Sequence, residues 1–476
     1  MALDLVAELS AIVGPRFVLS RPNELRVYES DGNTLFAERP RAVVLPSDRD
    51  QVAAVLRLCH RLGVPVVPRG AGTGLSGGAL PTEGAVVLGL NRMRRIRHID
   101  VANRRALVEP GVINAALSEA VRPFGLYYAP DPSSQAACTI GGNVAENSGG
   151  AHCLKYGVTT HHVLGLEVVR SDGEVFMVAG PWREGPGLDL RGLLIGSEGT
   201  MAVVTAAWVR LLPLPEAVET VLALFDDEES ASQAVSAVIA QGVVPAALEM
   251  MDRLAITAVE RGAYPVGFPE GLAAVLLLEV DGPREDVAEE AAEILSVVQR
   301  FRPRSMRRAE SPAERALWWA NRKTAFGSMG KIAPAYYVQD GVIPRSALTE
   351  VLRAIRAIAD DYRLPVANVF HAGDGNLHPL LAYDPRQAGA KERAMAAGSA
   401  ILEVCVAAGG SITGEHGVGV EKSAEMAFMF SEADLALMAR VRQALDPTGR
   451  LNPGKVLPTP SRCIDGRPRL SQPAAL

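Results

Sequence analysis

The sequence predicts an α+β protein that contains more than one domain. Its 476 residues exceed the usual length of a single domain. In the first half, three segments of small residues interrupt apolar strands, and in the second half strands alternate with helices. A proline-rich break at 212–215 separates these halves. We expect domains at 1–213 and 214–410, a closing segment at 411–456 and a loose tail at 457–476.

Composition and charge exclude several classes of protein. The net charge is −6 and no long basic run occurs, which argues against a nucleic-acid partner. Five scattered cysteines without a C-x-x-C pair suggest neither a disulfide framework nor a protein-bound iron–sulfur cluster. No run of about 18 apolar residues is present to span a membrane, and the N-terminus does not resemble a signal peptide. These features favour a cytoplasmic enzyme.

The first half opens with a short helix over 3–12 and a clear α/β unit. Residues 42–45 form an apolar run that predicts a buried strand. Ser47 is the expected N-cap of the following helix, because its hydroxyl can accept from first-turn amides. Gly63 stands where a helix commonly ends in a left-handed residue, and the next strand is expected at 64–67.

A glycine-rich loop follows that second strand. It contains Gly72-x-Gly74-x-x-Gly77, which matches the dinucleotide fingerprint of Rossmann folds. A Rossmann loop must open a helix, but here a turn at 79–84 leads into another strand at 86–88. We therefore reject a Rossmann fold and expect a nest of backbone amides around a diphosphate. The alternative is a flexible surface loop, which the strongly apolar flanking strands disfavour.

Two further segments of small residues lie later in the first half. Residues 131–150 are rich in Gly, Ser and Asn, and 196–200 read Gly-Ser-Glu-Gly-Thr after an apolar strand. Small residues let a ligand lie against the backbone, while hydroxyl and amide side chains donate to it. Three such loops on one scaffold suggest one large, polar, elongated ligand, and a dinucleotide is the simplest choice.

A hairpin with two histidines is the strongest chemical signal of the second half. Asp374-Gly375 predicts a two-residue type I′ turn. The expected pairs, running outward from this turn, are Gly373 with Asn376, Ala372 with Leu377, and His371 with His378. Opposed side chains lie roughly 5 Å apart, so both imidazoles could bind one divalent metal, with a third ligand available in Gly414-Glu415-His416-Gly417. The alternative is an ordinary turn with incidental histidines.

The order of elements after the proline break predicts a ferredoxin-like domain. Strands are expected at 220–225, 246–250 and 274–280, with helices at 228–239 and 284–298. Two more helices are expected at 391–408 and 432–445.

Taken in order along the chain, these motifs resemble the FAD-linked oxidases of the vanillyl-alcohol-oxidase superfamily. The loops at 70–78, 131–150 and 196–200 resemble their FAD-binding domain, of the type found in p-cresol methylhydroxylase (PCMH). The segments 371–378, 414–417 and 446–455 resemble their C-terminal domain. The resemblance covers about residues 20–456 and is greatest to the FAD-binding subunits of bacterial glycolate oxidases. D-lactate and D-2-hydroxyglutarate dehydrogenases are near relatives.

The resemblance implies a two-part FAD-binding domain, a ferredoxin-like cap and a C-terminal segment that returns to the flavin. Bound FAD is expected without a covalent link, because no histidine stands between Arg61 and Arg97, although the sequence leaves His152 open. The implied cofactor-binding residues are Arg69, Gly70, Ala71, Gly72, Thr73, Gly74, Leu75, Ser76, Gly77, Asp131, Pro132, Ser133, Thr139, Gly141, Gly142, Asn143, Glu146, Asn147, Gly149, Gly150, Glu198, Gly199 and Asn452.

The resemblance also implies a reaction. A small 2-hydroxy acid, with glycolate giving glyoxylate as the first choice, would lose its hydroxyl proton and pass a hydride to flavin N5. By resemblance His371, His378 and Glu415 hold a divalent metal (Zn, Mn or Fe), and His416 is the general base. Arg322 holds the carboxylate, although Arg322 and Lys323 beside a tryptophan are otherwise typical of core packing with solvated charges.

Asn376 and Tyr337 complete the expected substrate contacts, and Tyr336 is an alternative to Tyr337. Because the chain has no cluster motif, the resemblance implies a second FAD-binding-like subunit and an iron–sulfur subunit as electron acceptors. Those partners could hold it at the inner membrane; O2 is a less favoured acceptor. Rival interpretations are a D-lactate or D-2-hydroxyglutarate dehydrogenase, a colourless metallohydrolase, and a flavin-binding subunit that only supports an assembly.

Overall fold

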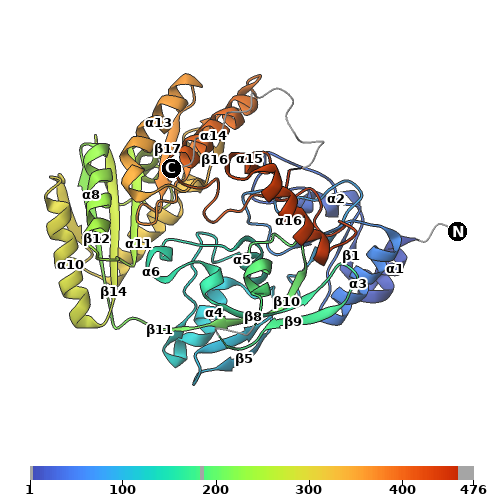
Figure 1. Cartoon of the computed structure of the whole chain (residues 1–476). Helices are drawn as coiled ribbons and strands as arrows, with labels where there is room; N and C mark the ends of the chain where they lie inside the picture. The colour runs from blue at the N-terminus through green and yellow to red at the C-terminus, as the bar shows by residue number, and fades with distance from the viewer. Residues whose placement is uncertain (1–3, 183–186, 459–476) are drawn as a thin grey trace.

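The computed structural model describes residues 4–182 and 187–458, and it is a mixed α/β structure with three larger sheets (Figure 1). Two of the sheets lie in the N-terminal half and the third, with its helices, in the second half. Most of the predicted tail lies outside the described residues.

The first sheet has four strands in the order β1-β2-β4-β3. These are β1 (Val18–Leu19), β2 (Ala42–Val44), β3 (Val66–Arg69) and β4 (Val86–Gly89). Strands β2 and β3 both run parallel to β4. Helices α1 (Leu5–Val13) and α3 (Arg49–Leu62) bury their apolar residues on this sheet with Val44, Val66 and Leu88.

Both ends of α3 test a prediction. The helix begins one residue later than expected, because Asp48 is the N-cap and its carboxylate accepts from the amide of Gln51 at 2.9 Å. The prediction of Ser47 as the N-cap was therefore wrong. Gly63 ends the helix in the left-handed region with φ +65°, as predicted. No helix forms between β3 and β4, which confirms that the glycine loop does not belong to a Rossmann fold.

The second sheet has five antiparallel strands in the order β5-β6-β10-β8-β9. Their bounds are β5 (Ile96–Asp100), β6 (Arg105–Val108), β8 (Val163–Val169), β9 (Val175–Ala179) and β10 (Val203–Arg210). Helices α4 (Asn114–Val121) and α5 (Ile140–Glu146) cover it, and Leu117 and Val144 pack against Leu166 and Val209. Strand β11 (Leu212–Pro213) pairs with β7 (Leu126–Tyr127) where the chain leaves this half.

The third sheet has seven strands in the order β15-β12-β14-β13-β17-β18-β16. The first four, β12 (Ala217–Phe225), β13 (Ala247–Asp252), β14 (Ala274–Gly282) and β15 (Ser305–Arg308), have the antiparallel order of a ferredoxin-like unit, as predicted. Three later strands extend it beside β13: β16 (Ala335–Val338), β17 (Val366–Phe370) and β18 (Pro379–Tyr383).

Helices cover both faces of this third sheet. The first face packs against α8 (Glu228–Ala240), α10 (Arg284–Gln299), α13 (Leu348–Asp361) and α14 (Ala390–Ala407). The second packs against α11 (Pro312–Lys323), α12 (Ala325–Ser328) and α9 (Arg253–Glu260), the last of which the sequence analysis did not predict. Successive residues of a strand point to opposite faces of the sheet, so neighbouring residues of one strand pack against different sets of helices.

The C-terminal segment returns to the N-terminal half. After α14 the chain runs through α15 (Met426–Met429) and α16 (Glu432–Leu445), the dark red elements over the first half in Figure 1. Leu451 then forms a parallel bridge to Val66 at the free edge of β3. The loop between α14 and α15, which carries Glu415 and His416, is thereby held between the two halves.

Candidate active site

A cavity of about 360 Å³ lies among the three predicted loops of small residues. Sixteen of the 23 predicted cofactor-binding residues line it: Arg69, Gly70, Ala71, Gly72, Thr73, Gly74, Leu75, Pro132, Ser133, Thr139, Gly141, Gly142, Asn143, Glu146, Glu198 and Gly199. Glu415, His416 and Phe326 of the second half also line it. The cavity therefore joins the two groups of motifs that the sequence placed far apart.

Two glycines show why small residues are needed here. A Cβ on Gly70 would lie 2.5 Å from the hydroxyl oxygen of Thr139, which caps α5 by accepting from the amide of Gly142 at 3.3 Å. Gly77 has φ +75°, and a Cβ there would lie 2.5 Å from a methyl group of Val420. The loop therefore passes too close to α5 and to the C-terminal segment for larger side chains.

The other seven predicted cofactor-binding residues are not part of the cavity lining: Ser76, Gly77, Asp131, Asn147, Gly149, Gly150 and Asn452. The Asn452 amide donates to the carbonyl oxygens of Gly78 at 2.8 Å and Glu198 at 2.6 Å, which ties the C-terminal segment to two cavity loops. The carbonyl oxygen of Ser76 accepts from the amides of Val420 and Glu421, both at 3.1 Å. These residues shape the cavity without facing it.

Two buried carboxylates stand at one end of the cavity. Glu198 accepts from the amides of Val418 at 2.7 Å and Gly419 at 2.8 Å. Glu146 has one carboxylate oxygen buried without a hydrogen-bond partner among the described residues. Burial, followed by the neighbouring charge of Glu198, raises the pKa of Glu146 well above its ordinary value. This shift favours the protonated form of Glu146, which can donate a hydrogen bond.

The histidine hairpin forms, but not in the predicted register. His371 pairs with Asn376, and β17 pairs with β18 in the same register, so four residues form the turn. The predicted pairing of His371 with His378 and the two-residue turn were therefore wrong. The two histidines are diagonal neighbours on one sheet face, and their ring centroids are 5.1 Å apart.

The predicted metal ligands come together. His371 Nε2 lies 3.1 Å and His378 Nε2 lies 3.4 Å from the same Glu415 oxygen. One ligand atom from each residue falls within a 4.8 Å cluster, and both histidines are buried. His378 Nε2 has no hydrogen-bond partner among the described residues. Two imidazoles and one carboxylate, with one ring nitrogen left unpartnered, fit a divalent cation.

Glu249 on β13 is a site residue that the sequence analysis missed. Its carboxylate lies 2.7 Å from Nδ1 of His371 and orients that ring with Nε2 toward Glu415. It also forms an ion pair with Arg322 on α11. Burial opposes ionisation of Glu249, but the positive charge of Arg322, followed by His371, keeps its pKa below the ordinary value.

The structure places Arg322 in this buried cluster, with only 4% of the residue exposed. Its Nη2 contacts the Glu249 carboxylate, whereas its Nε has no hydrogen-bond acceptor within the described chain. A buried guanidinium with a donor to spare is suited to a carboxylate ligand. Lys323, by contrast, pairs with Asp131 at 3.2 Å.

His416 joins the metal cluster to the cavity. Its ring stacks on His378 with centroids 4.8 Å apart and planes 5° apart, while it also lines the cavity. Phe326, which the sequence analysis did not single out, contacts both rings edge-on. Burial lowers the pKa of His416 to about 4, against the opposing effect of Asp340. The imidazole is therefore neutral at pH 7.

Asn376 and Tyr337, the remaining predicted substrate residues, have different positions. Asn376 packs its amide against Gly414, and its Oδ1 is buried without a partner in the described structure. The structure does not bring Tyr337 to the histidines, because it packs on the opposite sheet face against Gly398 of α14. Tyr336 lies on the histidines' face.

Comparison with known proteins gives matches over both halves of the chain. Residues 40–179 match the FAD binding domain family, and 214–456 match the family described as FAD linked oxidases, C-terminal domain. The chain is 49% identical to glycolate oxidase subunit GlcD of Escherichia coli K12, over 94% of this chain and 90% of that relative. It is 35% identical to a D-lactate dehydrogenase of Archaeoglobus fulgidus, over 87% and 91%.

Among solved structures, p-cresol methylhydroxylase with bound substrate has the same fold, with a TM-score of 0.80 at 19% identity over 95% of this chain and 96% of that one. The chain belongs to the FAD-linked oxidase family, as the sequence motifs predicted. It is a flavoprotein oxidoreductase of that family. No helix among residues 4–182 and 187–458 is long and apolar enough to cross a membrane.

Proposed function

We propose that this protein uses non-covalently bound FAD to oxidise a small 2-hydroxy acid, with glycolate giving glyoxylate as the first choice. The observation that carries this proposal is the loop at Glu415 and His416, which belongs both to the glycine-lined cavity and to the buried histidine cluster. A flavin in the cavity would therefore lie beside the groups that hold and deprotonate a substrate. The relative named glycolate oxidase subunit supports the choice of substrate.

The cavity fits FAD because one part of its lining is a glycine-rich loop with the hydroxyl groups of Thr73, Ser133 and Thr139, which suits a diphosphate, while apolar residues such as Leu194 and Val203 line the rest and suit flat rings. FAD, when bound, accepts a hydride at N5. His152, which the sequence left open as a covalent attachment point, has both ring nitrogens engaged by Asp131 and Glu279 at 2.9 and 3.1 Å. It does not line the cavity, which supports non-covalent binding.

His371, His378 and Glu415 would hold the divalent metal, and Zn, Mn and Fe all suit two imidazoles and a carboxylate. Such an ion supplies Lewis-acid stabilisation of charge on the substrate oxygen. Arg322, whose buried Nε has no acceptor among the described residues, binds the substrate carboxylate. Asn376 orients the substrate through its unpartnered Oδ1.

His416 acts as the general base in this proposal. Its ring lines the cavity and stacks on a proposed metal ligand, so a substrate hydroxyl held at the cluster would lie within its reach. On its other sides the ring contacts the buried His378 and the edge of Phe326. The base is thus placed on the side of the substrate that faces the cavity.

Electrons must then leave the reduced flavin. The four described cysteines, Cys59, Cys138, Cys153 and Cys405, are free, and the full sequence has no C-x-x-C pair. We propose that a second FAD-binding-like subunit and an iron–sulfur subunit accept the electrons on the way to a quinone, and that these partners provide any attachment to the inner membrane. The word subunit in the name of the relative supports such an assembly.

D-lactate oxidation is the second candidate function, because a D-lactate dehydrogenase is 35% identical over 87% of the chain. The oxidation of D-lactate would use the same residues, because D-lactate differs from glycolate only by a methyl group on the carbon that is oxidised. D-2-hydroxyglutarate is a more distant alternative.

Anaerobic bleaching of the flavin tests the proposal. The purified protein is mixed with glycolate, D-lactate or D-2-hydroxyglutarate, and absorbance near 450 nm is followed as flavin is reduced. Glycolate is expected to bleach the flavin fastest. His416→Ala should retain bound FAD and lose reduction by at least about 100-fold, whereas His161→Ala, an exposed histidine outside the cavity, should keep the wild-type rate. A wild-type flavin that no 2-hydroxy acid bleaches would refute the function.

A further inference from the structure

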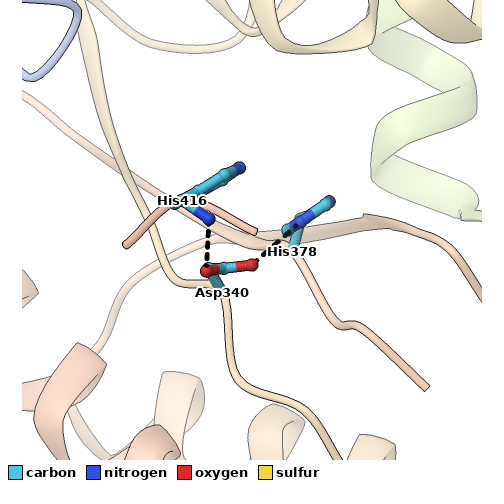
Figure 2. A group of neighbouring side chains, drawn as sticks. All are labelled: Asp340, His378 and His416. Carbon is cyan, nitrogen blue, oxygen red and sulfur yellow. Dashed lines mark hydrogen bonds and ion pairs between the residues drawn. The ribbon is translucent and has the colours of Figure 1, made fainter. Parts of the chain in front are cut away.

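A buried aspartate beside the histidine cluster has no role in the function proposed above. Asp340 follows β16 and is 0% exposed. Neither the predicted metal ligands nor the cavity lining includes it. Figure 2 shows its carboxylate between His378 and His416, joined to both by dashed contacts. A carboxylate placed at such a depth must be compensated by hydrogen bonds or charge.

The compensation comes from three successive backbone amides. Oδ2 of Asp340 accepts from the amides of Gly414 at 3.0 Å, Glu415 at 3.3 Å and His416 at 2.9 Å. The hydroxyl group of Thr413 also donates to it at 2.5 Å. Consecutive amides that converge on one oxygen form an anion-binding nest, so the path of this loop depends on the Asp340 charge.

The same carboxylate also faces two cationic or ionisable groups. Its Oδ1 lies 3.4 Å from Nε2 of His378, and its Oδ2 lies 3.4 Å from the ammonium of Lys422, which is 1% exposed. Lys422 in turn donates to the carbonyl oxygen of Gly417 at 3.0 Å, at the far end of the loop. Asp340 thus contacts His378 directly and the loop that carries His416 at 413–416, and it reaches Gly417 through Lys422.

Asp340, His378 and His416 could themselves form a cation-binding group, because their ligand atoms lie within 4.8 Å. The contacts argue for a different role. Oδ2 already accepts four hydrogen bonds from residues 413–416. Oδ2 is thus committed to the loop, and only Oδ1 faces His378. The carboxylate is therefore a part of the loop scaffold.

We propose that Asp340 is the positioning residue of this site: it fixes the carboxylate of Glu415 and the imidazole of His416 relative to His378. The inference rests on the proposed function, because it assigns Asp340 to the same cation and base. Loss of its charge would release the loop, so Glu415 would no longer meet the two histidines in one cluster. The cavity would keep its glycine walls.

The test compares Asp340→Asn with Asp252→Asn. Asp252 is a matched control, because it is also buried and its carboxylate accepts hydrogen bonds from the backbone amides of Ala255 and Asn368. It makes these contacts away from the loop that carries Glu415 and His416. Zn²⁺ affinity is measured by competition with a chromophoric chelator, and FAD content by absorbance. Asp340→Asn should keep FAD and bind Zn²⁺ about 10–100-fold more weakly, the usual loss when a residue orienting a metal ligand is changed. Asp252→Asn should bind Zn²⁺ like the wild type.

Thr413→Val provides a milder variant in case Asp340→Asn does not fold. It removes one donor to Asp340 with little change in volume and should weaken Zn²⁺ binding in the same direction, by several-fold. Wild-type Zn²⁺ affinity in both Asp340→Asn and Thr413→Val would overturn the inference, as would an equal loss in Asp252→Asn. If the wild type binds no Zn²⁺ and His371→Ala changes nothing, the proposed function itself has failed.

Discussion

A histidine that joins the two halves provides the sharpest stability prediction. His152 contacts Asp131 of the first half through Nδ1 at 2.9 Å and Glu279 of the third sheet through Nε2 at 3.1 Å. Burial alone would lower its pKa, but the charge and hydrogen bond of Asp131, followed by those of Glu279, raise the pKa to about 10. The ring is therefore a cation at neutral pH and links two carboxylates.

The sign of the pH dependence follows from this raised pKa. Stabilisation is fully present below the ordinary histidine value of 6.5 and is lost as the pH rises toward about 10. The rise in pKa from 6.5 to about 10 corresponds to roughly 4–5 kcal/mol of folding stability, at about 1.4 kcal/mol for each pKa unit. Without His152, Asp131 still has its ion pair with Lys323, and Glu279 still has its ion pair with Arg315. We therefore expect His152→Ala to lower the free energy of unfolding by about 3 kcal/mol at pH 6.5, at the lower end for a broken buried pair.

The assay is urea unfolding with excess FAD at several values between pH 6.5 and pH 10. The wild type should lose stability across this range, and both His152→Ala and His152→Gln should show a much flatter dependence. His161→Ala, which removes an exposed histidine, should follow the wild type. The reasoning is wrong if the variants lose stability with pH as steeply as the wild type, or if His152→Ala is no less stable at pH 6.5.

Three further predictions concern the cavity and the cluster. Gly70→Ala places a methyl group 2.5 Å from the Thr139 hydroxyl oxygen, so FAD content after dialysis should fall at least about tenfold while the far-UV circular dichroism is unchanged. Removing the metal with a chelator should slow bleaching by glycolate at least about 100-fold without changing the oxidised flavin spectrum, and added Zn²⁺ or Mn²⁺ should restore it. Gly375→Ala, at φ +79° and 2.2 Å from the Ile343 carbonyl oxygen, should lower the free energy of unfolding by at least about 1–2 kcal/mol, measured in urea. Unchanged FAD content in Gly70→Ala would contradict the first prediction, and bleaching that resists the chelator would contradict the second. Unchanged stability of Gly375→Ala would contradict the third.

The cavity loops could be predicted from the sequence because their signals are local. Glycines between apolar strands and the absence of a following helix are visible within 70–88, and the structure forms the loop without a helix there. The ferredoxin-like order was equally readable, since each strand and helix carries its own hydrophobic period. Local patterns also placed the end of α3 at Gly63.

The register of the histidine hairpin and the roles of the buried acids Asp340 and Glu249 could not be predicted, because both depend on contacts between segments far apart in the sequence. The segment 341–343 pairs with the hairpin: the amide of Leu377 donates to Gly341 and that of Ile343 to Gly375. This third segment holds a four-residue turn where the Asp-Gly pair alone predicts two residues. Asp340 and Glu249 bind groups more than 70 residues away along the chain, so neither gave a local signal.

The loop that carries Glu415 and His416 is held from both halves by buried carboxylates. Asp340 of the second half binds the amides of 414–416, and Glu198 of the first half binds those of Val418 and Gly419. The turn between these two anchors is Gly417, with φ +86°. Five of the six amides between Gly414 and Gly419 are therefore divided between carboxylates of the two halves, so a movement of either half would move His416 relative to the cavity. The position of His416 is set by the contact between the two halves, and the His152 link that joins Asp131 to Glu279 helps to hold that contact in place.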